Sequence, residues 1–283
     1  MRGGKALRPD NAGMSGTLSY HRDAGPGHST GGNEVAHVVI ANPGKHNAID
    51  IAMWRELRRL FEHLQSLPAQ DAPRALIVRG AGGQFASGGD IHEFASFRFN
   101  EQKLHEFHEH IVAPALHAML ACDIPLLAQI DGACIGGGLE IAACCDIRIC
   151  GASSRFGAPI ARLGFPMAPG ELALLLRVAG APVLREMLLE ARLLDAARAL
   201  QLGLVHAVVP DDGVAALALQ RAAAIADLSP QAARINKRSL RQMAAGGPTA
   251  AERLAHFSYA DSAEHIEGVT AFIEKRSARF GRD

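Results

Sequence analysis

Apolar and polar positions along the first half of the chain predict strands that alternate with helices. Apolar runs at residues 35–40, 75–78 and 125–130 are typical of buried strands, and a further strand is expected at 146–150. After the first of these runs, Asp50 is the expected N-cap of a helix whose apolar face is formed by Met53, Leu57, Leu60, Phe61 and Leu64. This alternation predicts an α/β core.

The second half of the chain is predicted to be mostly helical. Prolines at 159, 166 and 169 mark a loop, and from about Leu172 the pattern is helical almost to the end. Helices are expected at 182–190, 196–202, 213–227, 230–245, 249–260 and 263–276. We therefore predict a flexible N-terminal tail at 1–17, an α/β core at 18–210 and a helical C-terminal region at 211–283.

Composition and charge give no support to several classes of partner. The 283 residues include 29 Lys and Arg against 29 Asp and Glu, so the net charge is zero and nothing favours nucleic acid or an anionic membrane. No apolar stretch reaches the roughly 18 residues that span a bilayer. Five cysteines lie in the apolar middle without the C-x-x-C spacing of a zinc site, which predicts reduced, buried thiols in a cytoplasmic protein: Cys122, Cys134, Cys144, Cys145 and Cys150.

Two glycine-rich stretches carry the candidate chemistry. Residues 85–91 read FASGGDI and residues 132–140 read GACIGGGLE, and each follows a predicted strand. Glycines at such turns let backbone N–H groups approach a ligand, and two N–H groups that converge on one oxygen form an oxyanion hole, which contributes about 3–4 kcal/mol per donor. Neither stretch fits a nucleotide-binding glycine loop. Glu140 beside the second stretch is a candidate general acid or base, although the helix dipole alone also favours a glutamate there.

The histidines give a weaker signal. Residues 105–110 read HEFHEH, which matches neither H-E-x-x-H nor H-x-x-E-H, so a solvated helix face is expected rather than a metal site. His92, two residues beyond Asp90, is expected to be exposed.

Several segments in a fixed order resemble the enoyl-CoA hydratase/isomerase (crotonase) superfamily. The resemblance runs from about residue 18 to 282 and rests on NPGKHNA at 42–48, FASGGD at 85–90, the stretch 131–140, ACCDIR at 143–148, FGAP at 156–159, and segments at 199–205, 229–230 and 267–276. It implies a spiral of ββα units with a C-terminal helical trimerisation region, assembled as a homotrimer or homohexamer. It also implies an acyl-CoA thioester substrate, with no metal and no cofactor beyond the substrate's own coenzyme A.

The resemblance assigns roles to individual positions. It implies oxyanion donors at Gly89 and Gly137 and a catalytic carboxylate at Glu140. It implies contacts with coenzyme A at Lys45, Asn47, Ala48, Ala86, Asp90 and Ile91, and an approach of Lys275 to the coenzyme A of a neighbouring subunit.

One departure from the family pattern affects the expected reaction. Two-glutamate hydratases carry a second glutamate after the proline of the segment that here reads FGAPI, so Ile160 stands in its place. Glu171, in a downstream segment that is also altered, is a candidate displaced acid. Because Ile160 cannot activate water, weak hydration of crotonyl-CoA is expected. Isomerisation, decarboxylation, thioester hydrolysis and non-catalytic acyl-CoA binding remain alternatives.

Overall fold

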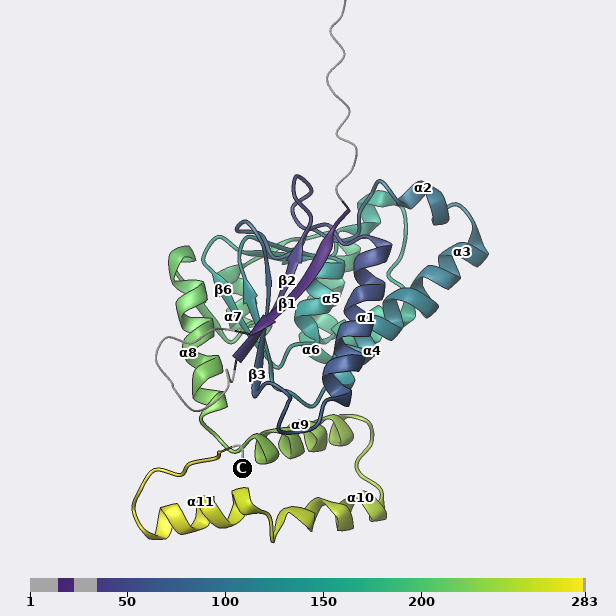
Figure 1. The fold of residues 1–283 in the computed structure, drawn as a ribbon. Helices are drawn as coiled ribbons and strands as arrows, with labels where there is room; N and C mark the ends of the chain where they lie inside the picture. Colours follow the sequence, from purple (N-terminus) through teal and green to yellow (C-terminus); the bar gives the residue numbers. More distant parts are fainter. Residues whose placement is uncertain (1–14, 23–34, 282–283) are drawn as a thin grey trace, which may run out of the picture.

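The computed structural model describes residues 15–22 and 35–281, and these form two sheets surrounded by helices (Figure 1). In the larger sheet β1 is antiparallel to β2 and every other neighbouring pair is parallel. Its order is β1 (Thr17–Arg22), β2 (Val35–Ala41), β3 (Ala75–Gly80), β4 (Leu126–Ile130), β6 (Ile147–Gly151) and β9 (Ala207–Val209). The smaller sheet has the order β5 (Ala133–Ile135), β7 (Arg155–Gly157) and β8 (Leu194–Asp195). The predicted α/β class is confirmed.

Alternate side chains of the central strands enter two separate cores. In β3, Leu76 and Val78 join the core that contains α1 (Ile51–Ser66) and α4 (Ala113–Ala121), whereas Ala75 and Ile77 pack against α8 (Val214–Ala226). This alternation follows from the two-residue period of a strand. Both faces of the sheet are therefore covered, as expected of a mostly parallel sheet.

Helix α1 forms as the sequence predicts. The side chain of Asp50 accepts a hydrogen bond of 2.8 Å from the N–H of Met53 and so caps the helix. The predicted apolar face is buried except Leu60, which is partly buried; its buried members are Met53, Leu57, Phe61 and Leu64.

The remaining helices follow the predicted order with shifted ends. The helix expected at 182–190 belongs to a longer α6 that begins at Pro169 and is broken at Gly180, whose φ is +77°. The helix expected at 249–260 divides into α10 and a 3-10 turn at His256–Tyr259. The other helical elements are α2 (Phe94–Phe97), α3 (Glu101–Glu106), a π-helix (Phe107–Val112), α5 (Gly137–Ala143), α6 (Pro169–Leu189), α7 (Ala196–Gln201), α9 (Pro230–Ala244), α10 (Ala250–Ala255) and α11 (Ala263–Ile273), with two further 3-10 turns at Ile160–Leu163 and Asp211–Gly213.

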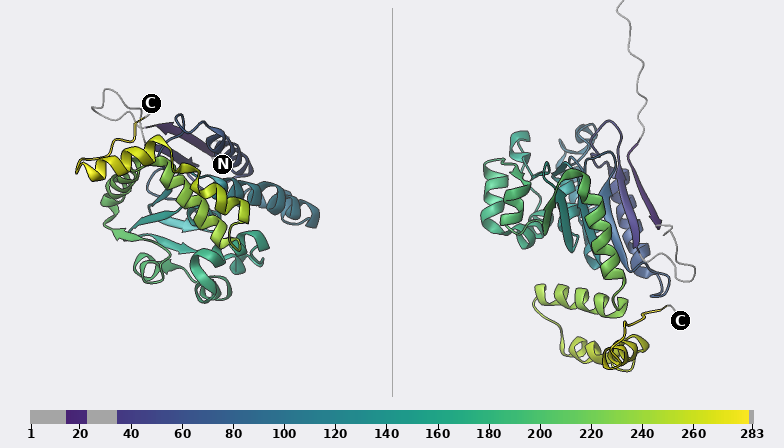
Figure 2. Two further views of the ribbon diagram at one scale, coloured as in Figure 1. Left: turned by 90° about the horizontal axis from the view of Figure 1, so that it is seen from below. Right: turned by 90° about the vertical axis from the view of Figure 1, so that its left-hand side faces the viewer.

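The helices beyond residue 210 divide into two groups. Helix α8 lies on the sheet, whereas α9, α10 and α11 form a separate layer beneath it (Figures 1 and 2). The predicted boundary at 210 thus precedes a helix that packs with the core. Of the predicted tail, residues 1–14 lie outside the described residues, and β1 begins at Thr17.

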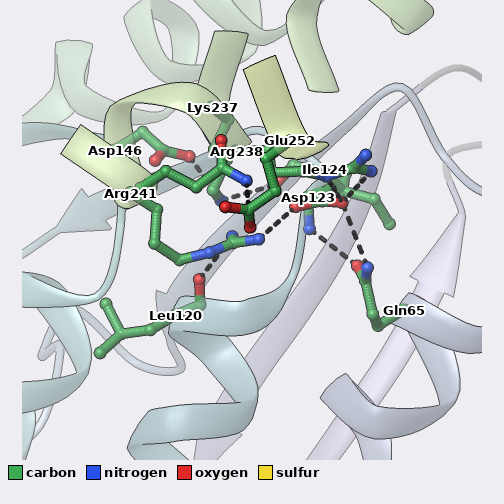
Figure 3. Close-up of polar contacts among 10 residues, drawn as sticks. Gln65, Leu120, Asp123, Ile124, Asp146, Lys237, Arg238, Arg241 and Glu252 are labelled. Carbon is green, nitrogen blue, oxygen red and sulfur yellow. Dashed lines mark hydrogen bonds and ion pairs between the residues drawn. The ribbon is translucent and has the colours of Figure 1, made fainter. Parts of the chain in front are cut away.

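A polar cluster around Asp123 joins α9 to the core (Figure 3). Arg238 and Arg241 each place a guanidinium nitrogen on Asp123, at 2.6 and 2.8 Å from its two oxygens. Beside them, Lys237 bonds the carbonyl of Ile124 and the carboxylate of Asp146, both at 2.8 Å. Burial raises the pKa of Asp123, but the arginine hydrogen bonds outweigh this effect and the net pKa is lowered. The cations of α9 are therefore engaged in holding the helix on the core.

Further sequence expectations concern residues outside the site. All five cysteines are free and buried, as predicted. Within residues 15–22 and 35–281, no group of three or more His, Cys, Asp or Glu residues could hold a metal ion. No helix in these ranges is both long and apolar enough to cross a membrane.

Candidate active site

The two glycine-rich turns lie side by side because their backbones pair with each other. Ala86 donates its N–H to the carbonyl of Ala133 at 2.9 Å, and Ile135 donates to the carbonyl of Ala86 at 3.0 Å. On the other side, Ile49 bridges the turn through Gly88 and Asp90. The loop after β3 is thus held between β5 and the segment before α1.

Glycine is required at two positions where these turns meet. Gly136 has φ +51°, a left-handed conformation that side chains disfavour. A Cβ on Gly138 would lie 2.6 Å from the carbonyl oxygen of Ala86, which is too close for any other residue. The glycine run therefore permits the close approach of the two turns.

The N–H groups of Gly89 and Gly137 both belong to residues that line one cavity of about 280 Å³. Neither N–H donates a hydrogen bond to an acceptor in the described part of the chain. Two unpaired backbone donors on the wall of one cavity suit a carbonyl oxygen that gains negative charge.

Two glutamates enter the same cavity. Glu140, in the first turn of α5, and Glu171, in the first turn of α6, are 8% and 3% exposed. Burial, followed by the charge of Glu171, raises the pKa of Glu140 from 4.5 to about 8, against a smaller opposing effect of Arg98. The site thus favours the protonated form of Glu140 more than water does. Glu171, the candidate displaced acid, reaches the cavity, and Ile160 also lines it.

The expectation of a solvated histidine face is wrong for His108. Its Nδ1 lies 2.8 Å from Oε1 of Glu171, and its side chain is 19% exposed and lines the cavity. His108 lies in the π-helix at Phe107–Val112, where the side-chain spacing differs from that of an α-helix. His105, one turn earlier, is exposed as expected, as is His92.

The sequence analysis missed Arg98, which also lines the cavity. Its guanidinium carbon lies 4.1 Å from the ring centroid of Phe94 and 3.8 Å from that of Phe165. Burial lowers the pKa of Arg98, although the charges of Glu171 and Glu140 act in the opposite direction. The phenylalanines at 94, 97 and 99, which surround it in the sequence, were the available signal.

Of the predicted coenzyme A contacts, four are largely engaged within the protein. The side-chain amide of Asn47 donates to the carbonyls of Ala81 and Gln84 at 2.8 and 2.7 Å. Ala48 and Ala86 are buried. Asp90, 4% exposed, forms an ion pair of 2.6 Å with Lys45.

The other predicted contacts are more accessible. The side chain of Lys45 is 33% exposed. Ile91 is 65% exposed and lines the cavity. Lys275 follows α11 in the C-terminal layer and does not line this cavity. Its approach to a neighbouring subunit stays a prediction.

Comparisons with known proteins identify the class to which this fold and site belong. The sequence model of the enoyl-CoA hydratase/isomerase family matches residues 30–283. The protein named probable enoyl-CoA hydratase echA8 in Mycobacterium bovis is 30% identical over 250 residues, which are 87% of this chain and 94% of that protein. The 2,3-dehydroadipyl-CoA hydratase of Escherichia coli K12 is 31% identical over 251 residues, 86% of this chain and 93% of that protein.

A crystal structure of an enoyl-CoA hydratase/carnithine racemase from Magnetospirillum magneticum superposes with a TM-score of 0.83. It is 36% identical, over 88% of this chain and 93% of that one. The chain belongs to the enoyl-CoA hydratase/isomerase family. It is an acyl-CoA enzyme with the crotonase fold, as the sequence predicts.

Proposed function

We propose that the protein hydrates the double bond of a 2-enoyl-CoA thioester. The observation that carries this proposal is the single cavity that contains two buried carboxylates, Glu140 and Glu171, and two unpaired backbone donors, those of Gly89 and Gly137. Adding water across a double bond requires one group to take a proton from water, another to deliver a proton, and donors for the enolate oxygen. The cavity supplies all four groups.

The proposed roles use the raised pKa of Glu140 and the contact of Glu171 with His108. The thioester oxygen accepts hydrogen bonds from Gly89 and Gly137 and gains charge as water adds to Cβ. Glu171 takes the proton that this water loses, and protonated Glu140 delivers its proton to Cα, so that the product gains one water. The extra proton on Glu171 then returns to Glu140, which restores the starting state. The proposed reaction uses no cofactor beyond the coenzyme A that the substrate itself carries.

We propose that Glu171 takes the role of the second carboxylate, so that hydration is not weak despite Ile160. The expectation of weak hydration rested on Ile160, which stands where a second carboxylate is usual and lies on the cavity wall. Glu171 enters from α6 instead and brings a carboxylate into the same cavity. Double-bond isomerisation, which moves one proton between carbons and needs no water, is the alternative if Glu171 does not act.

Two assays on the same preparation test the reaction. Crotonyl-CoA hydration is followed by loss of the enoyl absorbance, and α-proton exchange of a saturated acyl-CoA in deuterated water is followed by NMR. We expect hydration that both Glu140→Gln and Glu171→Gln abolish. Exchange that depends on Glu140 without hydration would instead show a one-carboxylate enzyme, and Ile160 would then be the cause.

His108 is proposed as a positioning residue for Glu171. Replacing it by leucine removes the 2.8 Å contact, so we expect kcat to fall roughly 10- to 100-fold while KM changes less. His108→Gln, which can still donate to the carboxylate, should recover part of the loss. His105→Leu on the exposed face of α3 is the matched control and should change little. Equal kcat for the leucine and glutamine variants would assign His108 a packing role only.

We also propose that the chain forms a homotrimer or homohexamer through its C-terminal layer. Large apolar side chains remain exposed there, namely Leu240, Met243, Leu254, Phe257 and Phe272, each at least 64% exposed. Exposed apolar area of this kind marks a contact surface. Light scattering on the purified protein should give the mass of a trimer or hexamer, and a monomer at micromolar concentration would contradict the proposal.

A further inference from the structure

Arg98 is fixed in the wall of the catalytic cavity by two aromatic rings. It follows directly after α2, and its guanidinium carbon lies 4.1 Å from the ring centroid of Phe94 and 3.8 Å from that of Phe165. A guanidinium is planar, and its N–H donors lie along its edge. The two rings are inclined at 79° to each other with centroids 6.2 Å apart, so they contact Arg98 from two sides without covering both of its faces.

The edge of Arg98 has an unpaired donor. Its Nε atom is buried and has no hydrogen-bond partner within the described residues. A second arginine of the cavity differs in this respect, because Arg162 donates to the carbonyl of Ala191 at 3.0 Å. A buried donor of a charged group without an acceptor is costly, and native proteins rarely retain one without a function.

The surroundings of Arg98 leave its charge available to a ligand. The charges of Glu171 and Glu140 act on Arg98 through space, but within the described residues neither carboxylate forms an ion pair with it, and Glu171 is in contact with His108 instead. The remaining wall near Arg98 is largely apolar, with Phe107, Ile160, Leu163 and Met167 among the lining residues. A plain hydrocarbon chain would thus fill the cavity and leave the donor unpaired.

We propose that the preferred acyl-CoA carries a carboxylate on its acyl group, and that the edge of Arg98 binds this carboxylate. The argument rests on the proposed acyl-CoA site in the same cavity. Guanidinium and carboxylate match as planar groups that share two parallel hydrogen bonds, and such charge-assisted bonds are about twice as strong as neutral ones. Arg98 is on this view a specificity-determining residue, because it selects the end of the acyl chain rather than the thioester.

Matched ligands test the proposal without any turnover. Hexanoyl-CoA and adipyl-CoA have acyl chains of equal length that end in a methyl group or a carboxylate. We expect calorimetry to show that the wild-type protein binds adipyl-CoA about 10-fold or more tightly. The corresponding 2-enoyl-CoA pair, assayed for hydration, should show the same preference in kcat/KM. Equal or weaker binding of adipyl-CoA would overturn the proposal.

Substitutions then test whether Arg98 is the residue responsible for the preference for adipyl-CoA. Arg98→Met keeps an unbranched side chain against the two rings and should remove the preference by weakening adipyl-CoA alone. Arg98→Lys, which keeps the charge but not the planar edge, should retain only part of it. Arg162→Met is the matched control and should leave the ratio of the two affinities unchanged, because that guanidinium already has an acceptor. Circular dichroism verifies that each variant is folded.

The outcomes separate this inference from the proposed reaction. Preferential binding of adipyl-CoA without turnover of either enoyl-CoA would support the carboxylate site and refute hydration. Hydration of both enoyl-CoAs at equal kcat/KM, unaffected by Arg98→Met, would refute the carboxylate site alone. A uniform loss of affinity for both ligands in Arg98→Met would place Arg98 on the shared coenzyme A portion and would also overturn the proposal.

Discussion

Glu140→Gln should lower hydration of an enoyl-CoA by about 100-fold or more, with acyl-CoA binding retained. Glutamine has nearly the same shape but cannot deliver a proton to Cα. The protonated form of Glu140 is available at neutral pH because burial and the neighbouring Glu171 raise its pKa to about 8. Stopped-flow hydration with wild-type and variant protein, alongside calorimetry with a saturated acyl-CoA, separates the two effects. Near-normal turnover would transfer the proton role to another group.

The same variant should change how stability depends on pH. Glu140 has a folded-state pKa of about 8 against an ordinary value of 4.5, so the folded state binds this proton more tightly than the unfolded state. The stabilisation is complete below pH 4.5 and is lost as the pH rises through 8. Glutamine does not titrate. Urea titrations of both proteins between pH 5 and 9 should show the wild type losing stability relative to the variant, and a constant difference would contradict the raised pKa.

Gly137→Pro should lower kcat by about 100-fold, because proline removes one of the two backbone donors. Gly137 is the first residue of α5, a position where proline fits a helix. Any Cβ at this position would lie 2.8 Å from the ring of Trp54, so steric strain must be separated from loss of the N–H.

Gly137→Ala provides this separation. Alanine brings the same Cβ toward Trp54 but keeps the N–H. We expect the proline variant to be about 100-fold slower than the alanine variant, with both folded by circular dichroism. If the two variants were equally slow, the Trp54 contact would explain the loss and the donor at Gly137 would have no role.

The sequence predicted the helices and strands whose formation depends on neighbouring residues in the chain. The capped α1 and the buried strands β3 and β4 follow from side-chain periodicity and capping alone. The predicted helix start at 182 agrees with the break at Gly180, but the helical segment from Pro169 to that break was not predicted as a helix, and the helix expected at 249–260 passes into a 3-10 turn after Ala255. Short strands such as β5 and β8 have too few residues for a period to be recognised.

The site was predictable where sequence neighbours form it and unpredictable where distant segments meet. Glu140 lies within its glycine motif, so its place beside the turn follows from the chain itself. Glu171 lies 31 positions further on, and only the packing of α6 brings its carboxylate into the cavity. Arg98 resembled an ordinary charged residue, because its contact with Phe165 joins segments far apart in sequence.

The π-helix at Phe107–Val112 makes the position of His108 depend on the number of residues in this segment. A π-helical turn contains more residues than an α-helical turn, so such a segment is equivalent to a residue inserted into an α-helix. Deleting one residue there would restore regular α-helix and rotate the preceding side chains, including His108, by about 100° relative to α4. A homologue with a one-residue gap at this point would thus lose the partner of Glu171 even if its histidine were retained. Alignment gaps in this helix are therefore as informative about the site as substitutions.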